Sequence, residues 1–469
     1  MPRTLAASAL LGLFLGSAIA HLLAPPHWQS LLDRIRQGGV LRVIALEGPV
    51  TYFAAWWGPA GVEYEIARRF AEALGVEIAW SSSRNIPAVI EALAGGKAHL
   101  AVGLAITEGA RKRARFTPPY RRVRARIIYR RGQRRPRRPG DLAEKVIEVM
   151  QASPFSERLR ALQRRHPELT WKESGSPLEE LLMLTWEGII DHTAADEEAF
   201  AHLRLFYPEL SPALELPPPL GFAFAFPKSE DASLYGAASA FLKRFRRSGG
   251  IKRLLDFYNG YVRRFDYVDT RTLIRRILLR LPRWRPHFQE AARKYGLDWR
   301  LLAAMAYQES HWNPKARSKT GVRGMMMLTR DTAAMLDIDD HLDPVKSIFG
   351  GARYFAWLKE KVPQRIPEPD RTFMALAAYN IGFGHLEDAR ILTQRQGGDP
   401  DAWVDVKRRL PLLAKRPFFE KTRHGYARGY EAVDYVEKIR RYHDILVHFT
   451  QEPLPLPPPR ALRILPEAL

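Results

Sequence analysis

Glu309 is the residue whose type and position are best suited to acid–base chemistry. It lies near the end of residues 298–310, a segment expected to be a helix that begins after Asp298 as its N-cap. Leu302, Met305 and Glu309 are separated by three and four residues, so the carboxyl is expected on the apolar face of that helix. Burial raises the pKa of a carboxyl, as a general acid near neutral pH requires. A buried glutamate that serves only structure is the alternative.

Two glycine-bearing segments follow the glutamate. Ser318, Gly321 and Gly324 have the spacing Ser-x-x-Gly-x-x-Gly, and three consecutive methionines, 325–327, come directly after them. The second segment, 377–384, reads Ala-Ala-Tyr-Asn-Ile-Gly-Phe-Gly and is expected at a helix end, where glycines let a sugar approach the backbone. Helix capping explains these last glycines equally well.

In this order, the three segments resemble the goose-type lysozyme and soluble lytic transglycosylase superfamily. The resemblance implies an all-α, lysozyme-like domain with Glu309 as its catalytic residue. It also implies that Ser318, Met327, Tyr379 and Asn380 bind substrate. Many relatives have Gln where this chain has Met327, which removes a polar contact to sugar.

The methionine run and the segment Gly425-Tyr-Ala-Arg-Gly429 are similar to the membrane-bound lytic murein transglycosylase F branch of that superfamily. The resemblance implies that Tyr426 lies near the catalytic carboxylate. Core packing of a helix-borne tyrosine is the alternative for Tyr426.

The helical half offers no second carboxylate in an equivalent motif, although two-carboxylate glycosidases require one. Four aspartates, at positions 331, 337, 339 and 340, lie near expected helix starts and turns, where capping explains them. The resemblance implies a lytic transglycosylase in which Glu309 acts as general acid and then as general base. That reaction cleaves the β-1,4 bond between N-acetylmuramic acid and N-acetylglucosamine in peptidoglycan and yields 1,6-anhydromuramyl products without water, metal or cofactor. The alternative is a non-catalytic peptidoglycan-binding sensor or scaffold, which would release no anhydro product.

The first half of the chain alternates segments of strand character with segments of helical period, which predicts an α/β domain with a largely parallel sheet. The candidate strands are 40–46, 76–80, 100–104, 125–129, 146–150, 189–190 and 222–226.

This half resembles extracellular solute-binding proteins of family 3, through residues 39–43 and the segment Phe116-Thr-Pro-Pro-Tyr120. The resemblance implies two lobes with a ligand cleft between them, holding a small ligand such as an amino acid or a muropeptide. Arg111 and Asp196 are the nearest equivalents of that family's ligand-binding residues, although Arg113 and Arg115 compete with Arg111, and a solvated basic face is an equal alternative.

We therefore expect two domains: an N-terminal, two-lobed periplasmic solute-binding fold of the α/β class, and a C-terminal all-α lysozyme-like domain. The expected boundaries are a signal peptide at 1–20, a solute-binding-like domain at 27–261, a linker at 262–280, the helical domain at 281–450 and a proline-rich tail at 451–469. An uncleaved N-terminal anchor is the alternative to the signal peptide.

The net charge and the absence of cysteine indicate which kinds of binding partner to expect. The formal net charge is +22, which favours attraction to polyanions such as anionic lipid or wall polymer. No Asp or Glu occurs between Arg111 and Arg138, and for this stretch a solvated basic face is as good an explanation as a contact with membrane or wall polymer. Export makes nucleic acid the least plausible partner. The chain contains no cysteine, which excludes disulfides, thiolate metal sites and a lipid-modified cysteine. We expect peripheral attachment at the periplasmic face of the outer membrane through basic residues, with glycan strands as the substrate.

Overall fold

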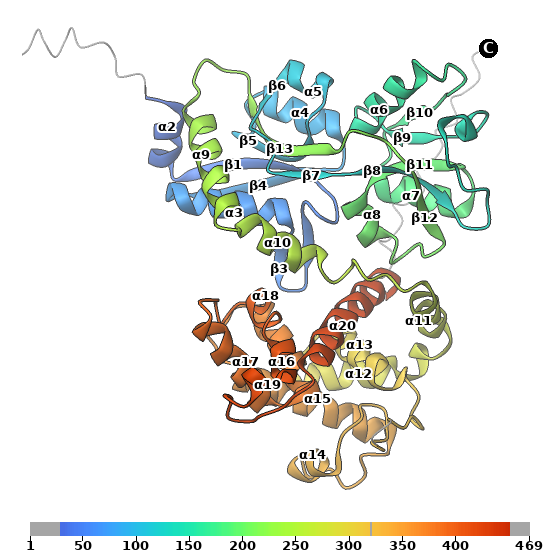
Figure 1. Cartoon of the computed structure of the whole chain (residues 1–469), viewed down its shortest axis with the longest axis vertical. Helices are drawn as coiled ribbons and strands as arrows, with labels where there is room; N and C mark the ends of the chain where they lie inside the picture. Colours follow the sequence, from blue (N-terminus) through green and yellow to red (C-terminus); the bar gives the residue numbers. More distant parts are fainter. Residues whose placement is uncertain (1–28, 319–320, 451–469) are drawn as a thin grey trace, which may run out of the picture.

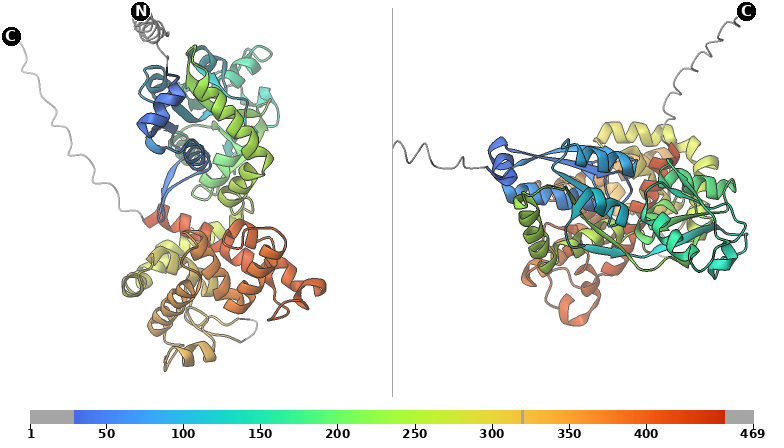
Figure 2. Two further views of the ribbon diagram at one scale, coloured as in Figure 1. Left: turned by 90° about the vertical axis from the view of Figure 1, so that its left-hand side faces the viewer. Right: turned by 90° about the horizontal axis from the view of Figure 1, so that it is seen from above.

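The computed structural model describes residues 29–318 and 321–450, which form an α/β domain stacked on a helical domain (Figure 1). The same stacking is visible from the side in the left view of Figure 2. The expected signal peptide and proline-rich tail lie outside the described residues, as do Lys319 and Thr320 within the glycine-bearing loop.

The first lobe of the α/β domain is built on a six-stranded sheet with the order β4-β1-β5-β13-β6, in which β7 also pairs with β13. β1 (Val40–Leu46) runs parallel to β4 (Glu77–Ser83) and to β5 (Leu100–Ala105). β13 (Leu220–Pro227) runs antiparallel to β5, β6 (Ala114–Phe116) and β7 (Arg121–Val123). The helices of this lobe are α2 (Leu31–Gly38), α3 (Val62–Leu74), α4 (Ile86–Ala94), α5 (Glu108–Arg113), α9 (Ser233–Arg247) and α10 (Gly250–Asn259).

The second lobe has a three-stranded antiparallel sheet, β11 (His192–Asp196), β8 (Ala125–Arg130) and β12 (Leu210–Glu215), with β8 in the middle. β9 (Glu148–Met150) and β10 (Lys172–Ser174) form a separate parallel pair. The helices here are α6 (Pro154–Gln163), α7 (Leu178–Glu187) and α8 (Glu197–Leu203), with the 3-10 turn η1 (Pro139–Leu142).

Six of the seven expected strands fall on observed strands, and one does not. Ile189 and Ile190 follow the left-handed C-cap Gly188 of α7, and Ile189 is exposed; the strand begins two residues later, at His192. The expectation of a largely parallel sheet was wrong for the second lobe. β13 also enters the first lobe antiparallel to its neighbours, because the chain returns there from the second lobe.

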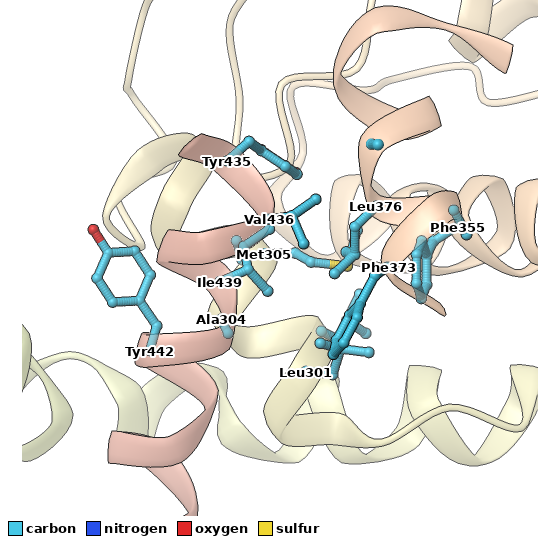
Figure 3. Packing of buried hydrophobic residues seen from close by; sticks show 14 of the residues in the cluster. Leu301, Ala304, Met305, Phe355, Phe373, Leu376, Tyr435, Val436, Ile439 and Tyr442 are labelled. Atoms are coloured by element: carbon cyan, nitrogen blue, oxygen red, sulfur yellow. The ribbon is translucent and has the colours of Figure 1, made fainter. Parts of the chain in front are cut away.

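The helical domain consists of α11 to α20. Its elements are α11 (Tyr267–Leu279), α12 (Leu281–Tyr295), α13 (Trp299–Ser310), α14 (Arg330–Met335), α15 (Pro344–Lys361), α16 (Asp370–Ile381), α17 (Phe383–Arg395), α18 (Trp403–Val406), η2 (Leu410–Ala414), α19 (Arg416–Phe419) and α20 (Gly429–Thr450). α13 and α16 both pack on the long α20. Figure 3 shows side chains from α13, α15, α16 and α20 meeting around Met305, which is fully buried. The core of this domain therefore surrounds the helix that carries Glu309.

The two domains share packed contacts. A hairpin of β2 (Phe53–Ala55) and β3 (Gly58–Ala60) points from the first lobe toward the helical domain (Figure 1), and Trp57 at its turn lies edge-on to Phe373 of α16, with ring centroids 6.3 Å apart. The stretch expected to be a linker, 262–280, is mostly α11, and its Leu273 and Ile277 pack in the core of the helical domain.

Candidate active site

The helix that carries Glu309 is fixed at both ends. The Asp298 side chain accepts a hydrogen bond from the backbone N–H of Arg300 at 2.8 Å, as the N-cap expected from the sequence. Directly after the helix, His311 and Trp312 both adopt positive φ angles, of 53° and 55°. The buried Trp312 indole donates to the Ala303 carbonyl at 2.8 Å, which ties this turn back to the helix. Backbone conformations of this kind persist only where the surrounding packing enforces them, and they concentrate at functional sites.

The carboxyl of Glu309 is largely shielded from water, although the residue as a whole keeps some exposure. Burial raises the pKa of this carboxyl to about 7, against a hydrogen bond from Tyr435 that lowers it. The Tyr435 hydroxyl donates to Glu309 Oε1 at 2.7 Å. A carboxyl with this pKa is present in both protonation states near neutral pH, so it can donate a proton and later accept one.

A second tyrosine lies beside the first. The Tyr379 hydroxyl donates to the carbonyl of Met326 at 3.0 Å, and its ring stacks on that of Tyr435 with centroids 6.4 Å apart and planes 11° apart. Proximity to Glu309 raises the pKa of Tyr379, after the larger effect of burial. α16, α20, the methionine segment and the helix that carries Glu309 therefore converge at one point.

The methionine segment is held rigidly against α15. Met325 and Met326 are fully buried, and the backbone N–H of Met326 donates to Ser347 Oγ at 3.2 Å. A Cβ at Gly351 would lie 2.7 Å from the Met326 side chain, so a larger residue there would have to displace Met326. Met327 is partly exposed and has a φ of 48°, a strained value for this residue type.

Ser318 organises the glycine-bearing loop. Its backbone N–H donates to the Val322 carbonyl at 2.8 Å, and its hydroxyl accepts from the Val322 N–H at 3.0 Å. These two hydrogen bonds of Ser318 stabilise the conformation of the loop. Asn380 is exposed at the end of α16, one residue after Tyr379.

Tyr426, expected near the carboxylate, is 55% exposed and lies edge-on to Phe419, whereas the tyrosine bonded to Glu309 is Tyr435. The sequence interpretation missed Tyr435. The signal was its place on the apolar face of α20, where it shares the buried stripe with Ala432, Val436 and Ile439.

Two of the four aspartates after the loop, Asp339 and Asp340, bind local partners. Asp339 pairs with Lys346 at 2.8 Å, and Asp340 accepts from the backbone N–H of Leu342 at 2.9 Å. One other carboxyl of the helical domain, Asp370, has a pKa raised to about 6 by burial, and it accepts the backbone N–H of Trp403 at 2.6 Å. Within the described residues, no contact joins any of these aspartates to Glu309.

In the α/β domain the two candidate ligand residues, Arg111 and Asp196, differ in their surroundings. Arg111 is exposed in the last turn of α5, and Asp196 caps α8 by accepting from the N–H groups of Glu198 and Ala199. The buried cation between the lobes is Arg121, which pairs with Glu63 of α3 at 2.8 Å and with Glu198 of α8 at 2.7 Å.

Comparison with known proteins gives the same two domains. Residues 41–261 match the family model of bacterial extracellular solute-binding proteins, family 3, and residues 286–401 match the transglycosylase SLT domain. Membrane-bound lytic murein transglycosylase F 1 of Alkalilimnicola ehrlichii is 44% identical over 92% of this chain and 90% of its own length. The chain belongs to the membrane-bound lytic murein transglycosylase F family.

Two other members of the family have a similar sequence identity to this chain. Membrane-bound lytic murein transglycosylase F of Saccharophagus degradans is 44% identical over 93% of this chain and 88% of its own length, and that of Stutzerimonas stutzeri is 44% identical over 90% and 87%. Among solved structures, ArgBP from T. maritima has 21% identity and a TM-score of 0.44, covering 48% of this chain and 98% of its own. The family matches confirm the two-domain fold class and the lytic transglycosylase assignment expected from the sequence.

Proposed function

We propose that Glu309 is the only acid and base with which this chain, a peptidoglycan lytic transglycosylase, cleaves glycan strands. One observation carries the proposal: the Glu309 carboxyl is shielded from water, has a pKa raised to about 7 and is held by Tyr435 at 2.7 Å. A carboxyl in this state is protonated often enough to donate and basic enough to accept. The family and the SLT domain make peptidoglycan the substrate.

In the proposed reaction, neutral Glu309 gives its proton to the oxygen that bridges the muramic acid C1 and the glucosamine C4. The C1–O bond breaks, and the glucosamine end leaves as an alcohol. The substrate's acetamido group stabilises the anomeric carbon, as in substrate-assisted glycosidases. The Glu309 carboxylate then takes the proton of the muramyl C6 hydroxyl, and the C6 oxygen closes on C1. Glu309 ends protonated, the product is a 1,6-anhydro sugar, and water is neither added nor released.

Tyr435 acts on Glu309 rather than on sugar. Its hydroxyl donates to Oε1, so it fixes the rotamer of the acid and stabilises the carboxylate after the first proton transfer. Tyr379 holds the methionine segment through the Met326 carbonyl. We place Ser318, Met327, Tyr379, Asn380 and Tyr426 along the glycan, as residues that touch or border it.

The test is the variant Glu309→Gln, which replaces the carboxyl by an amide of nearly the same shape. It should keep the far-ultraviolet circular dichroism of the parent and release no soluble muropeptides from purified sacculi. Tyr442→Phe, on the same helix as Tyr435, is a matched control because its hydroxyl bonds Asp269 instead. If Glu309→Gln digested sacculi at the parental rate, the proposal would be refuted.

Location and ligand follow as finer proposals. The curated relatives are named membrane-bound. None of the helices within residues 29–318 and 321–450 is long and apolar enough to cross a bilayer. We place the enzyme at the periplasmic face of the outer membrane, attached peripherally through basic residues. The solute-binding domain would take a small ligand such as an amino acid or a muropeptide, with Arg111 and Asp196 as its candidate residues.

A further inference from the structure

A hollow of about 300 Å³ opens on the helical domain between α17 and α19, which lie at the lower left of Figure 1. Ile391 and Leu392 of α17 and Phe418 of α19 contribute apolar walls. Its rim carries the cations Arg395, Lys421 and Arg423. Hollows of this size that combine apolar walls with a few charged groups are typical of small-ligand sites.

The three rim cations have no acidic partner among the described residues, and all three are exposed. The neighbouring acids are already engaged. Glu387 pairs with Arg390 at 2.7 Å, and Glu420 pairs with Arg416 at 2.7 Å.

Asp388, at the wall of the hollow, accepts the backbone N–H groups of Arg423 and His424 at 3.1 and 2.9 Å. These two bonds fix the turn that carries Arg423. The charge of Asp388 is directed at the backbone, so the rim keeps a positive potential that favours carboxylate or phosphate.

The hollow is lined by the helix that follows Tyr379 in the chain. α17 begins at Phe383, four residues after Tyr379, and a Cβ at Gly384 would lie 2.7 Å from the His424 ring. At a rise of about 1.5 Å per residue, the helix carries Asp388 and Arg395 roughly 8 and 18 Å beyond its first residue. His424, which follows the rim residue Arg423 in the chain, therefore packs against the first turn of α17, close in sequence to Tyr379.

We propose that this hollow binds the free carboxylates of the peptide stems attached to the muramic acid residues of peptidoglycan. The proposal rests on the proposed function, since it assumes a glycan bound beside Glu309. Peptide stems combine free carboxylates with short apolar side chains, which matches three cations above an apolar wall. A single phosphate would match the cations only and would leave the walls formed by Ile391 and Phe418 without a partner.

The experiment compares two substrates with the full-length enzyme: intact sacculi, and sacculi whose peptide stems have been removed by an N-acetylmuramoyl-L-alanine amidase. The test variant combines Arg395→Gln, Lys421→Gln and Arg423→Gln. The control variant removes the same charge from three exposed cations on α10, α11 and α12, with Lys252→Gln, Arg275→Gln and Arg293→Gln. The test variant should show about a tenfold higher KM on intact sacculi, as expected for three exposed charge pairs, an unchanged kcat, and parental kinetics on stripped glycan.

The other outcomes have distinct meanings. Equal losses on both substrates, or no loss on either, would overturn the peptide-stem site. A loss of binding to phosphatidylglycerol vesicles, with parental kinetics on intact sacculi, would assign the hollow to a lipid phosphate and overturn it as well. If the unmodified enzyme releases no anhydro product from either substrate, the proposed function fails, and that result is separate from any difference between the variants.

Discussion

The substitution Tyr435→Phe tests how the protein sets the pKa of Glu309, the proposed catalytic acid. It removes one hydroxyl whose bond to Glu309 Oε1 is 2.7 Å long and lowers the pKa of that carboxyl. A hydrogen bond to a charged group contributes about 1.5–3 kcal/mol, and part of it survives when the carboxyl is neutral. A net difference of about 1.4 kcal/mol corresponds to one pKa unit.

The direction follows from the reaction. The first step needs protonated Glu309, so kcat/KM should fall as the pH rises through the carboxyl's pKa of about 7. In Tyr435→Phe the carboxylate loses its donor, the pKa rises, and the midpoint of that fall should move up by about one pH unit. The maximum rate should also drop, because the acid loses the bond that orients it.

The assay is the release of soluble muropeptides from sacculi between pH 5 and 9, with kcat/KM fitted at each pH. Tyr442→Phe removes a hydroxyl from the same helix, but its 2.7 Å bond goes to Asp269, so its pH midpoint should match the parent. A midpoint in Tyr435→Phe that stays in place or moves to lower pH would refute the assignment of Tyr435 as the group that stabilises the carboxylate.

Three further substitutions test the surrounding structure. Glu309→Gln should stabilise the helical domain at pH 8 and leave its stability unchanged at pH 4. The Glu309 carboxyl has a pKa of about 7 in the folded state and 4.5 in the unfolded state, so its ionisation destabilises the folded state by about 3 kcal/mol at pH 8. Equal Tm shifts at the two pH values would contradict this. Arg121→Met leaves the buried Glu63 and the partly buried Glu198 without their cation, and should lower the free energy of unfolding by about 3–5 kcal/mol in urea. The same substitution at the exposed neighbour, Arg122→Met, should not lower it. Gly351→Ala displaces Met326, so it should lower Tm and kcat and reduce the free energy of unfolding by about 1–3 kcal/mol. An unchanged kcat would contradict the expectation that the position of the methionine segment matters for the reaction.

The sequence predicts the catalytic helix well because its signals are local. The cap Asp298 and the spacing of Leu302, Met305 and Glu309 lie within about three turns of one helix, and local periodicity is what a sequence displays directly. The core strands of the first lobe are predicted for the same reason, since β1 and β5 are short apolar runs.

Three features escaped prediction because they depend on tertiary packing. Tyr435 lies 126 residues from Glu309 and meets it only because α20 packs along α13. The antiparallel second lobe is equally non-local: β8 pairs with β11 and β12, which lie far along the chain, and single-strand patterns carry no information about direction. Arg121 was hidden within a basic stretch, where its pairing with Glu63 cannot be read from neighbours in sequence.

Mass spectrometry of the fragments that the enzyme releases from purified sacculi tests the central claim most directly. If Glu309 closes the C6 oxygen onto C1, the muramyl ends will be 1,6-anhydro sugars, lighter by one water than hydrolysed ends, and will carry no ¹⁸O when the digestion is run in H₂¹⁸O. Reducing muramyl ends labelled with ¹⁸O would contradict the account, because they would require a water nucleophile instead of the sugar's own hydroxyl.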